Sequence, residues 1–584
     1  MTLACIVYFA VTVVFFAAPA CAQDEWMVHL DTGHISPAQW AAQTGMQYVG
    51  SVGFLPGFFK FRSAATLTRA AHERARSVPG TLWAEPQVKR PRMFPRAAAA
   101  TTVTPSIPDP LYQQQWHLHD HPWSVQAPNH ATHVQADREG GEGVNVTIAI
   151  VDDGLEYAHP DLRPNYRAAH SWNYNQGPHG ASDCAPVGPE SGHGTCAAGV
   201  AAAASLNGHC GRGVAPKAGI AGIRLIAEAV TDATEAEGLS HHAISGVDIY
   251  SCSWGPYDDG ATLSAPDYMV RYAMAYNAGQ LKGRMGRGSI YVWAAGNGRA
   301  NGDSCAFDGY ATSPFAMAIG AVDYNGDQAW YSESCAALMA VAPSNGASGH
   351  GITTVDRLGS AGYDTGECTD SFGGTSSAAP LAAGIVALML EARPELTWRD
   401  VKHVIAMSAT PIHLNDPDAE WHTNARGYSH SPRFGFGLLV IPRLIAMARA
   451  HVLVPPLFKT SQSGMRPVRD AVIPHTFVYN VSAAQTQGIT FIEHVMLTIT
   501  LTHDKRGHVQ ITLESPEGTV SEMAPVRPQD DSFFWPSDGF RFMSVRHWGE
   551  SKVAGPWTIR VTDDFPDTRG RFVWNGFALD ITGY

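Results

Sequence analysis

The sequence predicts an α/β domain, a parallel sheet with helices on both faces, which is preceded by a small α+β unit and followed by a β-sandwich. Three observations lead to this prediction. Apolar runs of strand length alternate with helical patterns across residues 109–440, which is typical of a parallel sheet. A shorter mixture of strands and helices precedes that region. After residue 440 short strands separated by turn signals dominate, which indicates a sandwich.

Length and composition set the outer limits of this organisation. The chain has 584 residues, and single cores rarely grow past ~250–300 residues, so several domains are expected. A hydrophobic content of 45% with 16% charged residues fits a globular protein. The formal net charge of -13 argues against nucleic acid as a partner and suits a protein that attracts basic partners.

Residues 1–22 have the pattern of a signal peptide. Residues 3–18 are uncharged and apolar, and Ala20-Cys21-Ala22 fits the small-x-small rule, so we expect cleavage after Ala22. No positive charge lies near Met1, which leaves a signal anchor as the alternative. No later apolar run approaches the ~18 residues that span a bilayer. We therefore expect a chain of the secretory pathway or a secreted chain, with no transmembrane anchor after signal removal.

The elements are expected in the following order. The α+β unit, residues 23–96, has strands at 25–30 and 81–87, helices at 37–45 and 64–77, and a hairpin at 47–62; an Ala/Thr/Pro-rich linker, 97–108, follows. The α/β domain has strands at 146–151, 218–226, 248–253 and 289–295, and helices at 193–205, 238–246, 266–279, 376–391 and 397–408. The sandwich, 441–584, has strands at 491–502, 508–514, 541–547, 556–562 and 572–582.

Three polar side chains stand at positions where a parallel sheet places its active site. Asp152 ends a buried strand, His193 opens a helix between glycines, and Ser376 precedes an apolar helix. A serine hydroxyl is a poor nucleophile until a base takes its proton, and a carboxylate must hold that base in one tautomer. Asn297, at a strand end between glycines, could donate to an oxyanion. The alternatives are a capped core helix, a structural histidine and a simple turn.

The motifs around these residues occur together in one family. They read Val151-Asp152-Asp153-Gly154, His193-Gly194-Thr195, Ser253-Trp254-Gly255-Pro256, Asp258-Asp259-Gly260, Val292-Trp293-Ala294-Ala295-Gly296-Asn297-Gly298 and Gly374-Thr375-Ser376. The chain resembles the subtilisin-type serine proteases, specifically the kexin/furin proprotein convertases. The resemblance implies a subtilisin-like fold in which Ser376 attacks the peptide carbonyl, His193 moves the proton, Asp152 orients His193 and Asn297 completes the oxyanion hole.

The same resemblance implies a preference for basic substrates. Asp258 and Asp308 match acids of the S1 pocket, which suits a guanidinium at P1. Asp153 matches the S2 acid, and Glu235 and Tyr310 match S4 residues, while Trp254 and Gly255 match the substrate-binding strand. Ser264 replaces an S4 acid, and Ser191-Gly192 replaces a more polar pair before the histidine. We expect cleavage after paired basic residues, with a weaker demand for arginine at P4 than furin shows.

Calcium is the cofactor that the resemblance implies, since hard cations need ~6–8 oxygen ligands. One site would use Asp258, Asp303 and Glu333. A high-affinity site would use Asp109, Asp161, Asn207 and the carbonyls of Ala204, His209 and Gly211. The aspartates of a third family site are absent near residues 172–176, so we expect that site to be lost.

Cysteine usage fits an oxidising compartment. The resemblance implies the disulfides Cys210–Cys368 and Cys305–Cys335. Cys184, Cys196 and Cys252 remain, and Cys184–Cys196 is one possible pair, with Cys252 under the sheet. The sequons at Asn145 and Asn480 predict a glycoprotein, although Asn145 lies close to a core strand.

The flanking regions also resemble parts of the convertases. Residues 23–96 resemble the propeptide, which acts as a folding template and intramolecular inhibitor in the family. Pro91 makes the bond after Arg90 a poor substrate, so we favour maturation after Arg92, with Arg96 second. Residues 441–584 resemble the P (homo B) domain, without its disulfide, because no cysteine follows Cys368. A carbohydrate-binding or adhesion module is the alternative for this sandwich.

The leading hypothesis is a calcium-dependent, monomeric serine endopeptidase that processes precursor proteins after paired basic residues. A broad-specificity secreted subtilase is one alternative, and it would lack the S1 and S2 acids. A catalytically inactive binding scaffold is the other, and it would have lost one of the residues Asp152, His193, Asn297 or Ser376.

Overall fold

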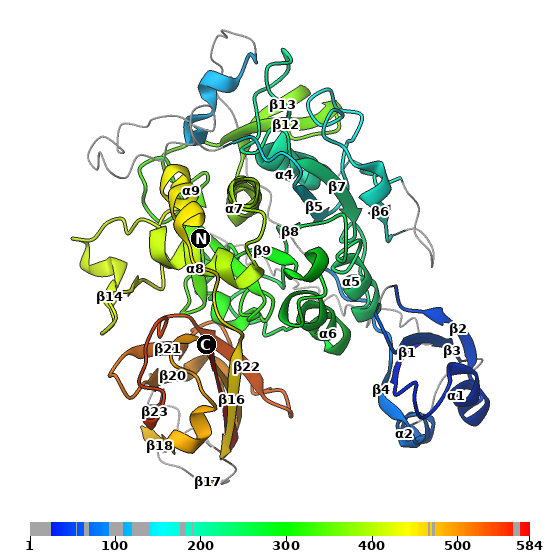
Figure 1. Cartoon of the computed structure of the whole chain (residues 1–584), viewed down its shortest axis with the longest axis vertical. Helices are drawn as coiled ribbons and strands as arrows, with labels where there is room; N and C mark the ends of the chain where they lie inside the picture. Colours follow the sequence, from blue (N-terminus) through cyan, green and yellow to red (C-terminus); the bar gives the residue numbers. More distant parts are fainter. Residues whose placement is uncertain are drawn as a thin grey trace, which may run out of the picture. The chain divides into compact units, whose positions relative to one another are not determined.

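The computed structural model (Figure 1) describes residues 25–53, 55–63, 69–92, 109–118, 141–175, 183–189, 191–464, 468–469, 474–563 and 573–584. The predicted signal peptide, the predicted linker 97–108 and Arg96 lie outside the described residues. The chain forms two compact units, of which the first is Met1–Arg90 with Thr231–Ala233, and the second is Pro91–Val230 with Thr234–Tyr584.

The first unit is the expected α+β fold. Its antiparallel sheet has the strand order β2-β3-β1-β4, with β1 Glu25–Leu30, β2 Gln47–Ser51, β3 Phe58–Arg62 and β4 Thr81–Pro86. The helices are α1 Pro37–Thr44 and α2 Arg69–Ser77. Ser36 caps α1 by accepting the Gln39 N–H, and Gly45 ends it in the left-handed region. The indole rings of Trp26 and Trp40 are fully buried in its core.

The second unit contains the predicted parallel sheet. Its seven strands have the order β11-β10-β9-β8-β5-β7-β6. They are β5 Thr147–Asp152, β6 Trp172–Asn173, β7 Gly219–Arg224, β8 Ile249–Cys252, β9 Ile290–Ala294, β10 Ala316–Val322 and β11 Leu338–Pro343. All neighbours pair in parallel. The strands β7 to β11 are buried along their whole length, as expected of a sheet covered on both faces.

Helices cover this sheet and bring the polar motifs to one edge. They are α4 His193–Ala202, α5 Asp232–Gly238, α6 Tyr268–Met274, α7 Thr375–Ala392, α8 Trp398–Ser408 and α9 Ile441–Ala450. Helices α4 and α7 pack against each other and against β5 (Figure 1). Within the described residues α7 alone is long and apolar enough to cross a membrane, but 89% of that stretch is buried inside the protein.

Three expectations for this domain need correction. The helix predicted at 238–246 is wrong, because α5 spans Asp232–Gly238 and residues 239–246 form turns. Its end at Gly238 agrees with the poor helix propensity of glycine. The strands β10 and β11 were not predicted, nor was the hairpin of β12 Ile352–Gly359 and β13 Gly366–Phe372. Helical structure also continues past residue 440, since α9 begins at Ile441 and packs on α7 and α8.

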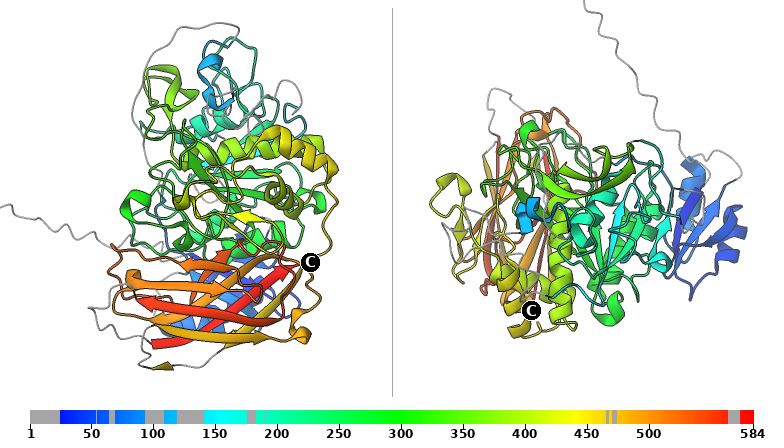
Figure 2. Two further views of the ribbon diagram at one scale, coloured as in Figure 1. Left: turned by 90° about the vertical axis from the view of Figure 1, so that its left-hand side faces the viewer. Right: turned by 90° about the horizontal axis from the view of Figure 1, so that it is seen from above.

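Residues after α9 form the predicted sandwich of two antiparallel sheets (Figure 2). One sheet has the order β16-β24-β19-β22, with β17 also pairing with β24, and the other has the order β18-β23-β20-β21. The strands are β16 Phe458–Gly464, β17 Val468–Arg469, β18 His475–Val481, β19 Ile492–Thr502, β20 Val509–Glu514, β21 Val520–Ala524, β22 Phe540–Ser544, β23 Gly555–Asp563 and β24 Val573–Gly583. Alternate residues of β20 are buried, as one face of a sandwich sheet requires.

A short paired strand also joins the loop between α8 and α9, with β14 His422–Thr423 antiparallel to β15 Ser429–His430. The sequon asparagines Asn145 and Asn480 are both exposed.

The cysteines from Cys184 to Cys368 form two disulfides and leave three free thiols. Cys210–Cys368 and Cys305–Cys335 are bonded, which confirms both expected pairs. Cys184, Cys196 and Cys252 are free and buried, so the possible Cys184–Cys196 pair is wrong. The Cys184 thiol instead lies 3.5 Å from the hydroxyl of Tyr166.

A buried ion pair joins α8 to the sandwich. The guanidinium of Arg399 donates from Nε to both carboxylate oxygens of Glu493 on β19, at 3.1 and 3.0 Å. His403 Nε2 lies 2.8 Å from the same carboxylate. Burial alone would raise the pKa of Glu493, but the bonds from His403 and Arg399 lower that pKa to about 2.

The pair predicts a pH-dependent loss of stability in a Glu493→Gln variant. Removing one partner of a buried pair costs roughly 3–5 kcal/mol, so the free energy of unfolding at pH 7 should fall by about that amount. Because the folded pKa is depressed, the wild-type carboxylate stabilises the fold above its ordinary pKa of 4.5 and loses this contribution as the pH falls to about 2. The difference between wild type and variant should therefore shrink over that range.

The matched control is Glu514→Gln in the same sandwich, which removes an exposed ion pair with Arg560. Surface pairs contribute about 0–1 kcal/mol, so this variant should stay close to wild type. Denaturant unfolding at pH 7 and at pH 3 measures both variants. Equal losses in the two variants at pH 7, or a Glu493→Gln loss that does not change with pH, would contradict this account of the junction.

Candidate active site

The predicted acid and base meet at the end of strand β5. Asp152 ends β5 and His193 opens α4, and each side chain is only 1% exposed. His193 Nδ1 lies 2.9 and 3.0 Å from the two carboxylate oxygens of Asp152. Burial disfavours a charged imidazole, but the charge and hydrogen bond of Asp152 outweigh it, and the pKa of His193 is raised. The pair can therefore hold a proton at His193 once the ring has accepted one.

Ser376 lies in the first turn of α7, where unpaired N–H groups gather. Its Oγ is 3.5 Å from the carbonyl oxygen of Ser253, whose own hydroxyl donates to the Ser376 carbonyl. The turn into α7 depends on Gly374, which has a φ of 73°. The ring of His193 packs 5.4 Å from that of Phe372, at the end of the strand that leads into this turn.

Asn297 faces the start of α7. Its Oδ1 accepts the Thr375 N–H at 2.8 Å and the Thr375 hydroxyl at 3.1 Å. Since the oxygen is occupied in this way, the amide nitrogen is the end of the side chain left to donate elsewhere. This is the arrangement that an oxyanion donor beside a nucleophilic serine requires.

Asp153 has a structural task that the sequence did not reveal. Its buried carboxylate accepts the N–H groups of Gly192 and Gly194 at 2.9 Å and of His193 at 3.1 Å. Burial and the neighbouring charge of Asp152 raise the pKa of Asp153 to about 6. The carboxylate therefore caps the N-terminus of α4 and fixes the backbone of His193. The expected S2 role of Asp153 stays a prediction.

The expected S1 residues lie around Asp308. The carboxylate of Asp308 accepts the Tyr310 N–H at 2.7 Å. Burial raises the pKa of Asp308 to about 7, and the charge of Asp258 adds to this rise. A β-carbon at Gly255 would lie 3.0 Å from the same carboxylate, so only glycine leaves room beside it. Trp254 is buried and donates from its indole to the Val151 carbonyl at 2.8 Å.

The expected S4 residues hold an arginine of the chain itself, which the sequence did not predict. The Tyr310 hydroxyl donates to Glu235 at 2.5 Å. Arg92 lies 2.6 Å from the Glu235 carboxylate and 2.6 Å from the Tyr310 oxygen, and its side chain is only 5% exposed. Its guanidinium also lies over the Tyr310 ring, 5.2 Å from the centroid. Glu235 and Tyr310 therefore bind the guanidinium of a buried arginine of the same chain, and their expected S4 role stays a prediction.

The three acids of the first expected calcium site lie behind the Asn297 loop. Asp258 accepts the Asn297 N–H at 2.9 Å, and Glu333 accepts the Gly298 N–H at 2.8 Å. Asp303 accepts the Gly260 N–H at 2.9 Å. Burial, reinforced by the charges of Asp258 and Asp303, raises the pKa of Glu333 well above its ordinary value. Such a group of buried acids suits a cation, which would restore their ionisation.

The second expected set also comes together. Asp109 accepts the N–H groups of Leu206, Asn207 and Gly208. The Asn207 amide donates to Asp161 Oδ1 at 2.7 Å, and the Ala204 N–H donates to the Asp161 carbonyl at 2.8 Å. Burial raises the pKa of Asp161 to about 7. The buried Asp161 Oδ2 has no hydrogen-bond partner among the described residues, so this oxygen suits a cation ligand. His209 and Gly211 lie on the same loop, and His209 pairs with Glu367.

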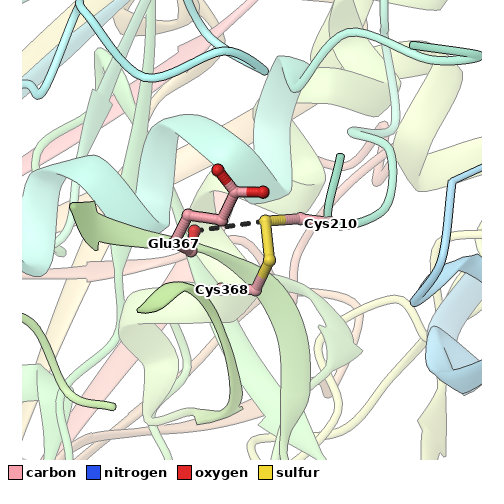
Figure 3. Close-up of side chains that lie close together, drawn as sticks. All are labelled: Cys210, Glu367 and Cys368. Atoms are coloured by element: carbon pink, nitrogen blue, oxygen red, sulfur yellow. Dashed lines mark hydrogen bonds between the residues drawn. A yellow bond between two sulfur atoms is a disulfide. The ribbon is translucent and has the colours of Figure 1, made fainter. Parts of the chain in front are cut away.

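One tighter cluster is not a metal site (Figure 3). One group of three His, Cys, Asp or Glu side chains in the described part of the chain has its possible metal-binding atoms all within 4.8 Å of one another. Its members are Cys210, Glu367 and Cys368. The two sulfurs form a disulfide, and the Glu367 backbone carbonyl lies 3.1 Å from the Cys210 sulfur. Disulfide sulfurs are not thiolates, and metals bind the thiolate.

Two family descriptions match the chain. Residues 143–437 match the subtilase family, and residues 492–579 match the proprotein convertase P-domain. The first match holds the Asp152, His193 and Ser376 segments, and the second covers most of the sandwich.

Curated relatives match over most of the chain. It is 35% identical over 555 residues to proprotein convertase subtilisin/kexin type 6 of Rattus norvegicus, covering 92% of this chain and 57% of that protein. It is 38% identical over 467 residues to kexin of Saccharomyces cerevisiae, covering 78% and 54%. It is 37% identical over 470 residues to the dibasic-processing endoprotease of Schizosaccharomyces pombe, covering 78% and 63%. The chain thus spans about half to two thirds of the length of these relatives.

Solved structures confirm the fold. The serine protease of Aeromonas sobria in complex with its chaperone matches with a TM-score of 0.70 at 22% identity, covering 82% of this chain and 96% of that chain. The same protease by itself matches with a TM-score of 0.69 at 23% identity, covering 83% and 97%. From the site geometry, the two family matches and these folds together, we conclude that the chain belongs to the subtilase family and carries a proprotein convertase P-domain.

Proposed function

We propose that this chain is a serine endopeptidase that cuts precursor proteins after basic residues. The observation that carries the proposal is the buried Asp152–His193 pair, at the start of a helix, α4, that packs against α7, the helix that carries Ser376 in its first turn. The names of the relatives, a proprotein convertase, kexin and a dibasic-processing endoprotease, support the same reading.

In the proposed reaction Ser376 Oγ attacks the scissile carbonyl while His193 takes the hydroxyl proton. Asp152 keeps the imidazole in one tautomer and stabilises its positive charge. The Asn297 amide and the first N–H groups of α7 stabilise the oxyanion, an effect worth about 3–4 kcal/mol for one such donor in subtilisin, a protease of the same family. His193 then gives its proton to the leaving amine, and water hydrolyses the acyl-enzyme by the same route.

Specificity would come from the acidic pockets. Asp308 would pair with a P1 guanidinium, whose planar donors suit a carboxylate. The contacts of Arg92 with Glu235 and Tyr310 support binding of an arginine upstream of P2, at P4 or P5, so this preference would be stronger than the sequence suggested. Precursor proteins with basic sites and the chain's own N-terminal unit would be the partners, in the secretory pathway or outside the cell.

Calcium is the proposed cofactor, and the residues present fit it. Asp258, Asp303 and Glu333 would hold one ion, and Asp109, Asp161 and Asn207 with neighbouring carbonyls would hold another. An ion at the first site would neutralise the acids that accept the N–H groups of Asn297 and Gly298. It would thereby keep the loop that carries Asn297 in place.

The placement of Arg92 bears on maturation. Bound between Glu235 and Tyr310, Arg92 cannot at the same time fill an S1 pocket as the P1 residue. This geometry supports cleavage beyond Arg92, at Arg96, the next basic residue, for which Met93 would be P4 and Arg92 would be P5, and not after Arg92, the bond that the sequence favoured.

Cleavage of two fluorogenic peptides tests the proposed function. A peptide ending in Lys-Arg at P2–P1 should be cut in calcium and not in a chelator, because the acidic pockets favour basic side chains. A peptide ending in Ala-Phe should be cut roughly 10⁴-fold more slowly, the scale on which buried polar groups that are left unpaired discriminate. The Ser376→Ala variant should cut neither. Equal turnover of both peptides would favour a broad-specificity subtilase, and no turnover after removal of the N-terminal unit would favour an inactive scaffold.

Intact-mass analysis of the mature protein tests the maturation site. The new N-terminus should be Ala97, and Arg96→Ala should block its formation. Arg92→Ala should slow the same cut without moving it, because it removes only the buried contacts with Glu235 and Tyr310. A mature chain that begins at Met93 would show that Arg92 is the P1 residue and would refute this assignment.

An Asp153→Asn variant tests the positioning of His193. Catalysis needs the neutral imidazole, so kcat/KM rises with pH through the raised pKa of His193. Removal of the Asp153 charge, one of the groups that raise this pKa, should move the acidic limb to lower pH. The value of kcat should also fall, because one amide oxygen cannot replace a carboxylate that accepts three N–H groups.

The matched control is Asp183→Asn, at an exposed acid of the same domain. Its pH profile should overlay that of the wild type. An Asp153→Asn profile with an unmoved acidic limb would mean that Asp153 does not act on His193.

A further inference from the structure

A single arginine of the sandwich reaches three parts of the proposed substrate site. Arg527 follows strand β21 and is fully buried. One guanidinium nitrogen donates to the Thr262 carbonyl at 2.7 Å and to Asp303 Oδ1 at 3.1 Å. The other donates to the Ala261 carbonyl at 3.2 Å. The guanidinium also stacks on the Phe307 ring, 3.7 Å from the centroid.

The groups that Arg527 touches lie next to the acids of the site. Ala261 and Thr262 follow Asp258 by three and four positions in the sequence, and Phe307 directly precedes Asp308. Asp303 is one of the three acids behind the Asn297 loop, and its other oxygen accepts the Gly260 N–H. Arg527 therefore fixes Asp303, the segment after Asp258 and the residue before Asp308 at the same time.

Other residues of the sandwich hold Arg527 in this position. Asp530, itself buried, accepts from Arg527 and takes two bonds from Arg506, at 2.7 and 3.1 Å. Arg506 also donates to the Ala261 carbonyl. A planar guanidinium fixed by a carboxylate and by an aromatic face has little freedom to move, which is what precise placement of Asp303 requires.

We propose that Arg527 is a positioning residue of the substrate site, through which the β-sandwich sets the geometry of Asp303 and of the Asp258 segment. The proposal rests on the proposed function, and it predicts that cation affinity and the binding of a basic P1 side chain both depend on this residue of the sandwich. A residue that only holds the sandwich against the α/β domain would change neither the cation affinity nor the binding of the P1 side chain.

The junction supplies a control of the same chemistry. Arg399 is also a buried arginine that pairs with a carboxylate across it, that of Glu493, but among the described residues its contacts include no acid of the site. Arg527→Lys and Arg399→Lys each keep the charge and lose the planar fork. Any loss that comes from weakening the junction in general should appear in both variants.

The experiment compares both variants with wild type in the full mature chain. Calcium dissociation constants are measured by calorimetry, KM and kcat with the Lys-Arg peptide, and unfolding temperatures by calorimetric scanning. Arg527→Lys should weaken calcium binding by roughly 10- to 100-fold, the range for residues that orient metal ligands, and should raise KM more than it lowers kcat. Arg399→Lys should lower the unfolding temperature and leave both constants within about twofold of wild type.

The outcomes separate this proposal from the proposed function. If Arg527→Lys only lowers the unfolding temperature, as Arg399→Lys does, Arg527 is a clamp and the proposal is overturned. If the wild type binds no calcium, the proposed metal site fails and the comparison of KM decides. If the wild type binds calcium but cuts no basic peptide, the calcium affinities of the two variants decide whether Arg527 is a positioning residue.

If Arg527→Lys does not fold, a second variant, Phe307→Leu, takes its place, because it removes the ring on which Arg527 stacks. It should weaken calcium binding in the same direction, and unchanged affinity would overturn the proposal.

Discussion

Carboxylates buried where water cannot stabilise their charge determine how this site is built. Burial raises the pKa of Asp153, Asp258, Asp308 and Glu333. A buried acid must receive hydrogen bonds or meet a cation, because its desolvation is otherwise too costly. Here backbone N–H groups supply the bonds, from the start of α4, from the Asn297 loop and from Tyr310. The acids thereby fix the segments that carry the proposed catalytic side chains.

These hydrogen bonds stabilise the buried negative charge only in part. A positively charged group beside an acid stabilises it further. Arg92 shows how a guanidinium enters such a pocket, between Glu235 and Tyr310. Arg527 does the same for Asp303 from the sandwich. The same requirement accounts for the proposed preference for basic substrates and for calcium. The proposed substrate specificity, the proposed metal binding and the contact of the sandwich then have one cause, which is that buried carboxylates need positive charge beside them.

The sequence predicted the elements and motifs well and the contacts between them poorly. Apolar runs located β5, β7, β8 and β9, and the helices α7 and α8, because burial and periodicity are local signals. The helix expected at 238–246 was misplaced, since a short run of Ala and Glu before Gly238 carries little periodicity. The arginines 92, 399 and 527 have partners far along the chain, and no pattern reveals which acid each will meet. The cap formed by Asp153 depends on backbone direction, which the sequence does not show.

Proton release on binding tests the central claim most directly. The Ser376→Ala protein, with its N-terminal unit removed by added wild-type enzyme and saturated with calcium, is titrated at pH 7 with an amidated peptide ending in Lys-Arg, in two buffers that differ in ionisation enthalpy. Burial raises the pKa of Asp308 to about 7 while the charge of Arg92 is present to lower it, so part of this carboxylate is protonated at that pH, and more of it once Arg92 has been removed. A bound guanidinium lowers its pKa, and the account predicts a net release of protons that Asp308→Asn abolishes. Binding with no proton release, or with uptake, would show that the buried acids are not what the basic side chain neutralises.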